Sequence, residues 1–147
     1  MGAGIALQSA AIEPRIEAVI AEASFCNLRE AAYDYAGLHF SPWLGKTLFR
    51  PVVWAVIHGT KNEGGFLPDD VSPEKAVALR PFPVLLICDG RDRTLPCRHS
   101  KRIYAAAGGP KQLWVVPHAS HTAAYGTAPQ EFEHRTLDFL ASQAPAG

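Results

Sequence analysis

Three short apolar segments of the chain have the pattern of buried β-strands. They are Ile16 to Ala21 (IEAVIA), Val84 to Cys88 (VLLIC) and a segment at residues 112–116 (QLWVV). Nearly continuous apolar and β-branched runs of this length are typical of strands that are covered on both faces. Segments with helical patterns separate them, and this alternation predicts a parallel sheet. We therefore expect an α/β fold of three parallel strands in sequential order, with helices on both faces.

The segments around these strands carry the end signals of helices. Residues 2–12 open with small residues and continue with an apolar face, and Pro14 ends them. Asn27, with Glu30 three residues later, is typical of a helix cap with its reciprocal partner, so we expect a helix from there to Gly37. Further helices are predicted after Ser72, at about residues 98–107 and at about residues 129–142, the last with four residues facing the core: Phe132, Leu137, Phe139 and Leu140.

Two polar residues follow consecutive strands and are candidates for acid–base chemistry. Asp92 lies in the loop after the second strand, and His121 lies in the loop after the third, 29 residues later. Loops at the carboxyl ends of parallel strands line the ligand crevice of an open sheet, and this spacing accommodates one right-handed crossover. We therefore expect the two side chains to lie within about 3–4 Å, with the imidazole as a base that the carboxylate orients.

Other interpretations of these loops stay open. Asp92 is also a residue type that caps turns, although we interpret Asp89 as the turn residue, and His118 is the second choice for the base. His118 and His121 with the two aspartates are residue types that bind metals. Residues three apart share a face only on a helix, and these pairs lie in predicted loops, so we expect neither a metal nor a cofactor.

Residues 38–70 have a looser pattern and are predicted to form an irregular helical insertion over the candidate site. Their apolar residues recur at helical intervals, but Pro51 is expected to divide them into two short helices. The glycine-rich part from Gly59 to Asp70 is predicted to be a loop. Trp43 and Trp54 are predicted to be core residues or walls of the substrate pocket.

The composition limits the kinds of partner that we expect the chain to bind. At 147 residues the chain has the size of one domain, its formal net charge is zero, and it has no basic stripe, so we expect neither nucleic acid nor an anionic membrane as a partner. No apolar run approaches the roughly 18 residues of a membrane-spanning helix. Cys26, Cys88 and Cys97 have no CxxC spacing and are expected to be reduced, which predicts a cytoplasmic location.

Three segments carry a family resemblance. GAGIAL at residues 2–7 is similar to a helix start after a nucleophile elbow, and PVLLICDGRDRTLP at residues 83–96 is similar to a strand and loop that carry an acid. PHASH at residues 117–121 occupies the position of a Gly-x-Gly-His turn, with its glycines replaced. In order and spacing they resemble the C-terminal part of the α/β-hydrolase family, close to serine esterases and serine-aminopeptidase-like proteins. The resemblance covers essentially the whole chain. It implies that the chain is the C-terminal segment of one α/β-hydrolase domain.

The resemblance implies hydrolysis of small ester, amide or thioester substrates, with His121 as the base and Asp92 as the acid of a triad. It also implies an oxyanion donor at the backbone nitrogen of Met1, altered here because that nitrogen is an amino terminus. The serine of G-x-S-x-G would precede Met1, and these serines lack the flanking glycines: Ser24, Ser41, Ser100 and Ser120.

We therefore expect the chain alone to be inactive. The alternatives are a non-catalytic binding module of the same fold, or half of a split enzyme. The first strand would then have an unpaired edge, which the missing N-terminal half or a second copy of the chain is expected to cover.

Overall fold

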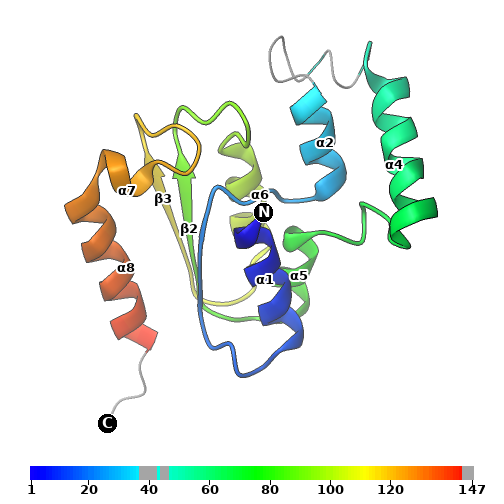
Figure 1. Ribbon diagram of the computed structural model, residues 1–147. Helices are drawn as coiled ribbons and strands as arrows, with labels where there is room; N and C mark the ends of the chain where they lie inside the picture. Colours follow the sequence, from blue (N-terminus) through cyan, green and yellow to red (C-terminus); the bar gives the residue numbers. More distant parts are fainter. Residues whose placement is uncertain (37–42, 44–46, 144–147) are drawn as a thin grey trace.

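A three-stranded parallel sheet forms the centre of the computed structural model, which describes residues 1–36, 43 and 47–143. Its strands are β1 (Val19–Glu22), β2 (Val84–Asp89) and β3 (Lys111–Val116), in the order β1-β2-β3 (Figure 1). Val19 lies opposite Val84, which lies opposite Lys111. The predicted strands, their direction and their order are confirmed. The first strand begins later than predicted, because a turn bond from Ile16 N to Glu13 O occupies its expected start.

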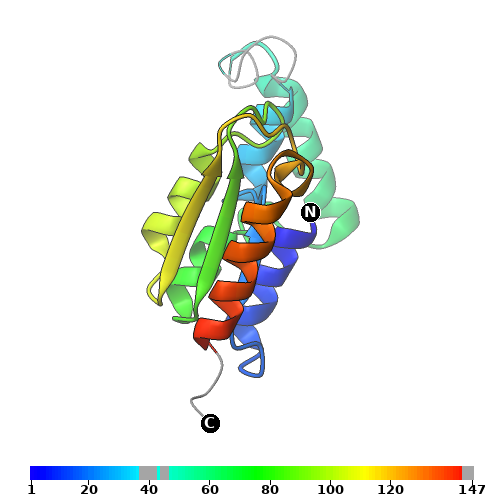
Figure 2. The ribbon, with the colours of Figure 1, turned by 90° about the vertical axis from the view of Figure 1, so that its left-hand side faces the viewer.

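Helices cover both faces of this sheet (Figure 2). Alternate residues of a strand point to opposite faces, and the β2 side chains divide accordingly between two apolar clusters. One cluster joins Leu86 to α1 (Gly2–Ile12), α5 (Pro73–Leu79) and α6 (Arg98–Ala106). The other joins Leu85 and Ile87 to α7 (Ala124–Thr127) and α8 (Pro129–Gln143). Both faces of β2 are therefore buried, as its continuous apolar sequence predicts.

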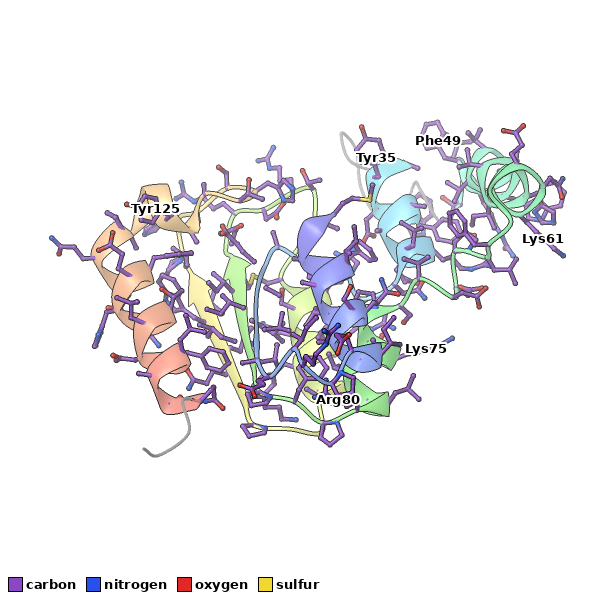
Figure 3. All side chains as sticks on the ribbon, turned by 60° about the horizontal axis from the view of Figure 1, so that its bottom comes forward. Tyr35, Phe49, Lys61, Lys75, Arg80 and Tyr125 are labelled. Atoms are coloured by element: carbon purple, nitrogen blue, oxygen red, sulfur yellow. A yellow bond between two sulfur atoms is a disulfide. The ribbon has the colours of Figure 1, made fainter. Side chains whose placement is uncertain are left out.

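Helix α1 is held at both ends by close contacts. A Cβ atom added to Gly4 would lie 2.8 Å from the Phe25 ring, so only a residue without a side chain fits at this point. At the other end the Arg80 guanidinium donates hydrogen bonds to carbonyl oxygens that no helical N–H reaches (Figure 3). Its acceptors are Ala10, Glu13, Pro14 and Ile16. These contacts fix the connection from α1 into β1.

Helix α2 (Leu28–Ala36) begins as the sequence predicts. The Asn27 side-chain oxygen accepts hydrogen bonds from the backbone N–H groups of Arg29 and Glu30, at 2.9 and 3.3 Å. Ser72 caps α5 in the same way, at 3.4 Å from the N–H of Lys75. The predicted stop at Gly37 lies outside the described residues.

One prediction about residues 38–70 is wrong, and Pro51 marks the start of a helix. A turn at residues 47–49 precedes α4 (Arg50–Gly64), and Pro51 lies in its first turn, where the missing N–H of proline would be unpaired in any case. The helix expected before Pro51 lies mostly outside the described residues. The predicted loop from Gly59 is helical as far as Gly64. The helix ends where Gly65 adopts a left-handed conformation with φ of 69°.

The predicted inward face of α8 is only partly right. Phe139 is buried and Phe132 is partly buried against the sheet, whereas Leu137 and Leu140 are exposed, at 64% and 50%. Residues 132 and 139 are two helical turns apart and share one face, and Leu137 lies well off that face. The narrow sheet covers a single stripe of the helix. None of the described helices combines the length and the apolar character needed to cross a membrane.

Candidate active site

Asp92 and His121 are in contact at the carboxyl ends of β2 and β3. His121 Nδ1 lies 2.7 Å from Asp92 Oδ2, and the Asp92 side chain is 0% exposed while that of His121 is 38% exposed. The other carboxylate oxygen, Oδ1, accepts hydrogen bonds from the backbone N–H groups of Thr94 and Leu95, at 2.7 and 2.8 Å. Asp92 therefore has both arrangements that its sequence context predicts: one oxygen caps the turn and the other contacts the imidazole.

The two loops that carry these residues are joined through their backbones. Gly90 N donates to Val116 O at 2.8 Å, and Arg91 N donates to Ala119 O at 2.8 Å. A Cβ atom at Gly90 would lie 2.7 Å from the carbonyl oxygen of Pro117. The acid loop and the histidine loop can approach this closely only because residue 90 has no side chain.

The hydrogen-bond partners assign the proton of the imidazole. An ionised carboxylate only accepts hydrogen bonds, so the Nδ1–H of His121 donates to Asp92. The neutral ring then has its lone pair on Nε2, the nitrogen that can take a proton from a neighbouring group. This geometry is the one that a base and its orienting carboxylate require in a triad.

Two further carboxylates hold the histidine loop, and the sequence analysis missed both. Asp89 Oδ2 accepts the backbone N–H of Thr122 at 2.8 Å, and Glu22 Oε1 accepts that of Ala124 at 3.0 Å. Asp89 is the last residue of β2, and its carbonyl closes the predicted turn by accepting the N–H of Asp92, while its buried side chain binds the opposite loop as well. The signal in the sequence was an acid at the carboxyl end of each of two adjacent strands.

The Asp89 carboxyl has an unusual environment. Its pKa is raised from 3.8 to about 6, first by burial and next by the Glu22 carboxylate; Asp92 adds to the rise, whereas the Thr122 N–H and His121 oppose it. Its second oxygen, Oδ1, is buried without a hydrogen-bond partner among the described residues. Near neutral pH this group is therefore an acid that folding makes harder to ionise.

An apolar pocket of about 320 Å³ opens beside His121. Its walls come from the N-terminus of α1, from α2 and from the acid loop, and are formed by Met1, Phe25, Leu28, Ala31, Ala32, Tyr35, Thr94, Leu95 and His121. Met1 thus lies at the same pocket as the imidazole. Trp43 and Trp54 do not line this pocket and are both exposed. Helix α2 forms the side of the pocket where the sequence placed these tryptophans.

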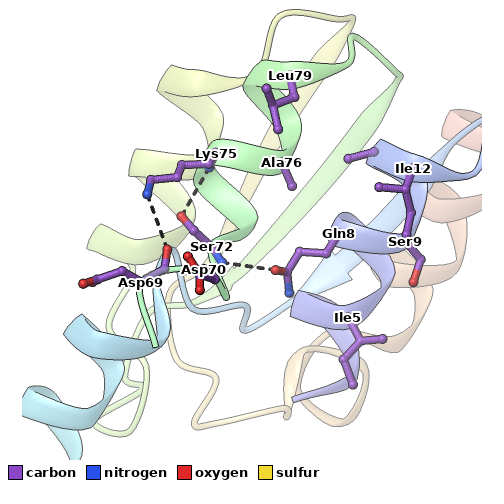
Figure 4. Close-up of a pocket in the computed structure, with 11 residues that line it drawn as sticks. Ile5, Gln8, Ser9, Ile12, Asp69, Asp70, Ser72, Lys75, Ala76 and Leu79 are labelled. Atoms are coloured by element: carbon purple, nitrogen blue, oxygen red, sulfur yellow. Dashed lines mark hydrogen bonds between the residues drawn. The ribbon is translucent and has the colours of Figure 1, made fainter. Parts of the chain in front are cut away.

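A larger cavity of about 530 Å³ lies between α1 and α5 and contains none of the predicted site residues (Figure 4). Gln8 and Ser72 lie across it, with the Ser72 N–H donating to the Gln8 side chain at 3.1 Å. Its apolar rim includes Ile5, Ile12 and Leu79, all of which are exposed. The cavity combines this apolar rim with the charged side chains of Asp69, Asp70 and Lys75 and contains no imidazole.

A second imidazole network lies buried beneath α2. His99 Nε2 is 2.7 Å from Asp34 Oδ2, and His99 Nδ1 is 3.1 Å from the Cys26 sulfur. Arg98 also contacts the Asp34 carboxylate. The order thiol, imidazole, carboxylate is that of a cysteine triad, but Cys26 is fully buried and burial raises the pKa of its thiol. The network therefore joins α2 to α6 and offers no accessible nucleophile.

The cysteines differ from the sequence-based expectation. Cys88 and Cys97 form a disulfide that closes the acid loop between β2 and α6, whereas all three cysteines were expected to be reduced. Only Cys26 is a free thiol among the described residues. The disulfide holds the two ends of the segment that contains Asp92.

The other candidate groups have no acid–base partner near the site. His118 is exposed, and no described carboxylate contacts its ring. Ser24 and Ser100 are buried, Ser120 is exposed, and Ser41 lies outside the described residues. Within the described ranges, no group of three or more histidine, cysteine, aspartate or glutamate side chains is arranged to hold a metal ion.

Known proteins show the same fold. No protein-family model matches the chain. The uncharacterized protein YfhR of Escherichia coli (strain K12) is 31% identical over 83 residues, which are 55% of this chain and 29% of YfhR. Acetyl xylan esterase 1 from Thermoanaerobacterium sp. JW/SL YS485 superposes with a TM-score of 0.67 at 20% identity, over 97% of this chain and 43% of the esterase. The Pyrococcus furiosus esterase Pf2001 gives 0.68 at 18% identity, over 95% and 50%.

The chain therefore has part of the α/β-hydrolase fold, as its sequence predicts, and its structural neighbours are esterases and serine hydrolases. It spans less than a third of the length of YfhR and about half or less of the two esterases. The partial coverage is compatible with a C-terminal segment of such a domain.

Proposed function

We propose that the chain is the C-terminal segment of a serine hydrolase that cleaves small ester, amide or thioester substrates. The observation that carries the proposal is the 2.7 Å contact between His121 and the buried Asp92 at the mouth of an apolar pocket. The esterase fold of the structural neighbours supports the same reaction class.

In the proposed mechanism, His121 Nε2 takes the proton of a serine hydroxyl as the serine attacks the substrate carbonyl carbon. The imidazole then gives this proton to the leaving group, and in the second half-reaction it activates water. Asp92 holds the Nδ1–H tautomer and stabilises the imidazolium. The serine is proposed to precede the position of Met1, and the backbone N–H at that position is proposed to stabilise the oxyanion.

The pocket beside His121 suits an uncharged acyl or aryl group. Its walls have no charged side chain besides the imidazole, and the small residues Ala31 and Ala32 leave room for the substrate. A charged acyl group would lose its hydration in this pocket without gaining a partner. The described part of residues 38–70 continues from α2 and is proposed to belong to an insertion over the site.

Half of a split enzyme is the second candidate. No serine or cysteine is among the residues that form the pocket, and β1 has no neighbour on its outer edge among the described strands. A partner chain would then supply both the missing strand and the serine. If no partner supplies a nucleophile, the same pocket would serve as a binding module.

A cytoplasmic location is also a proposal, and the disulfide is the observation that opposes it, because disulfides persist mainly in oxidising compartments. Trapping the thiols with an alkylating reagent in intact cells measures this directly. Alkylated Cys88 and Cys97 would indicate a reducing compartment, and a protected pair would indicate an oxidising one.

The function is tested with a fluorophosphonate probe for activated serines. The 147-residue chain should show no labelling, because it lacks the nucleophile. The protein that carries residues ahead of Met1, or a complex with the partner chain, should be labelled at one serine that lies outside the 147 residues. Labelling of a serine within the chain would contradict the proposal.

The acid and base are tested in the same active protein. His121→Gln and Asp92→Asn should each lower kcat by about three to four orders of magnitude, as expected when a triad loses its base or its correct tautomer. His118→Gln is the matched control and should keep most of the activity. If His118→Gln inactivates the protein and His121→Gln does not, the roles are assigned to the wrong histidine.

A further inference from the structure

Three carboxylates hold successive parts of the histidine loop. Asp92 contacts the His121 ring, Asp89 accepts the backbone N–H of Thr122, and Glu22 accepts that of Ala124. Asp92 follows β2, whereas Asp89 and Glu22 are the last residues of β2 and β1. Two of the three acids therefore belong to the rigid sheet and bind the backbone just after the histidine.

The residue after His121 needs such support. Thr122 has a φ of 56°, in the left-handed region that a β-branched residue adopts only at a cost in energy. Such a conformation persists only where the surroundings fix it. The bond from Thr122 N to Asp89 Oδ2, at 2.8 Å, determines the orientation of the peptide that joins His121 to Thr122. If this peptide turned, the His121 ring would move away from Asp92.

Asp89 is placed to provide this support. It is 2% exposed and forms part of the β2 ladder opposite Val116, so its backbone cannot follow the loop. The titratable groups that affect its carboxylate are Glu22 from β1, Asp92 from the acid loop and His121 from the histidine loop. The turn after β2 is closed by a backbone bond from Asp92 N to Asp89 O and does not need the Asp89 side chain. The burial of this side chain and its bond to the opposite loop therefore indicate a different role.

We propose that Asp89 is a positioning residue for His121: by accepting the Thr122 N–H, it holds the imidazole against Asp92, with the ring proton on Nδ1 and the lone pair on Nε2. The inference rests on the proposed function insofar as His121 is the base of that reaction. The position and tautomer of the ring are measured without any turnover, so the positioning role of Asp89 and the proposed function can fail independently.

The experiment uses ¹⁵N NMR of the histidine rings in the 147-residue chain, at a pH where His121 is neutral. The ring nitrogen shifts distinguish the Nδ1–H tautomer from the Nε2–H tautomer. Asp89→Ala removes the acceptor, whereas Asp89→Asn keeps an oxygen that can accept the Thr122 N–H. Glu63→Ala removes an exposed acid on α4 and is the matched control.

The unmodified chain, Asp89→Asn and Glu63→Ala should keep the Nδ1–H tautomer of His121, and Asp89→Ala should lose it. Amide exchange at Thr122 should be about tenfold or more faster in Asp89→Ala than in Asp89→Asn. A folded Asp89→Ala that keeps the tautomer, or an Asp89→Asn that loses it, would overturn the inference.

Asp89→Ala is a change in the core and can prevent folding. The decision then comes from the through-hydrogen-bond coupling between the Thr122 amide nitrogen and the side-chain carboxyl carbon of residue 89 in the unmodified chain. Its presence, with the tautomer retained in Asp89→Asn, supports the inference. Its absence overturns it, whatever the result of the activity measurements.

Discussion

Asp89 also dictates how the stability of the chain depends on pH. Its pKa is about 6 in the folded protein against 3.8 for the ordinary group, mainly because the carboxyl is buried and next because Glu22 lies nearby. Because the folded protein binds this proton more tightly than the unfolded chain does, the group adds to the free energy of unfolding. This contribution is fully present below pH 3.8 and is lost as the pH rises through about 6. A shift of about two pKa units corresponds to about 3 kcal/mol, which we take as an upper limit.

The perturbation is Asp89→Asn, which removes the titration and keeps an oxygen to accept the Thr122 N–H. Relative to the unmodified chain, its free energy of unfolding should increase between about pH 4 and about pH 7.5 by up to about 3 kcal/mol. Any fixed effect of the new amide group, such as an unpaired N–H in place of the unpaired Oδ1, is the same at both pH values. The difference between the two pH values therefore isolates the cost of ionising Asp89.

The assay is urea unfolding followed by tryptophan fluorescence at several pH values in this range. Glu63→Gln, which neutralises an exposed carboxylate, is the control and should differ from the unmodified chain by a constant, small amount. The reasoning is refuted if Asp89→Asn differs from the unmodified chain by the same free energy of unfolding at about pH 4 and about pH 7.5. In that case the folded environment does not oppose the ionisation of Asp89.

Three further changes test contacts elsewhere in the fold. Asp34→Ala should lower the free energy of unfolding in urea by about 3 kcal/mol, because it leaves the buried His99 ring without its acceptor. Cys97→Ser should lower it by about 2–3 kcal/mol, the value expected for opening a short disulfide loop. Ile12→Lys should shift the chain toward the monomer in light scattering, because it places a charge on an exposed apolar surface that we expect to associate.

Each of these changes has its own control. Glu131→Ala breaks an exposed ion pair on α8 and should cost no more than about 0.5 kcal/mol, so a similar loss for Asp34→Ala would mean that the His99 network contributes little. Treating the unmodified chain with a reductant should reproduce the effect of Cys97→Ser, and no effect of either would exclude the disulfide. Leu137→Lys charges an exposed site on α8, and an equal effect there would remove any special role of α1.

The expectation of association rests on α1. Its sequence, GAGIALQSAAI, is apolar except at Gln8 and Ser9, but only Gly4, Leu7 and Ala10 are buried. A helix that is apolar on all sides is normally buried on all sides. The outer face of α1 and the outer edge of β1 are therefore the surfaces that we propose are covered by further protein, such as a second copy of the chain. A monomer with a cooperative melt above about 60 °C would contradict this expectation.

Local patterns predicted the three strands and most of the helices but missed α7, and helix ends were right where their signals are local. The cap at Asn27 and the cap at Ser72 each use a side chain and backbone groups within three residues. The error at Gly59 came from interpreting a glycine as the start of a loop, whereas α4 continues as far as Gly64. The error at Leu137 came from assuming a broad buried face, whereas its exposure depends on how much sheet lies beneath α8.

The sequence by itself determined the parallel sheet and the meeting of Asp92 with His121. Both follow from order along the chain, because a right-handed crossover places the carboxyl ends of consecutive strands at one edge of the sheet. Only the tertiary structure decided that the two oxygens of Asp92 have separate partners and that Asp89 and Glu22 bind the histidine loop. The bonds of Asp89 and Glu22 join residues 33 and 102 positions apart in the chain. They depend on the directions of side chains in the folded protein, which a local sequence pattern does not predict.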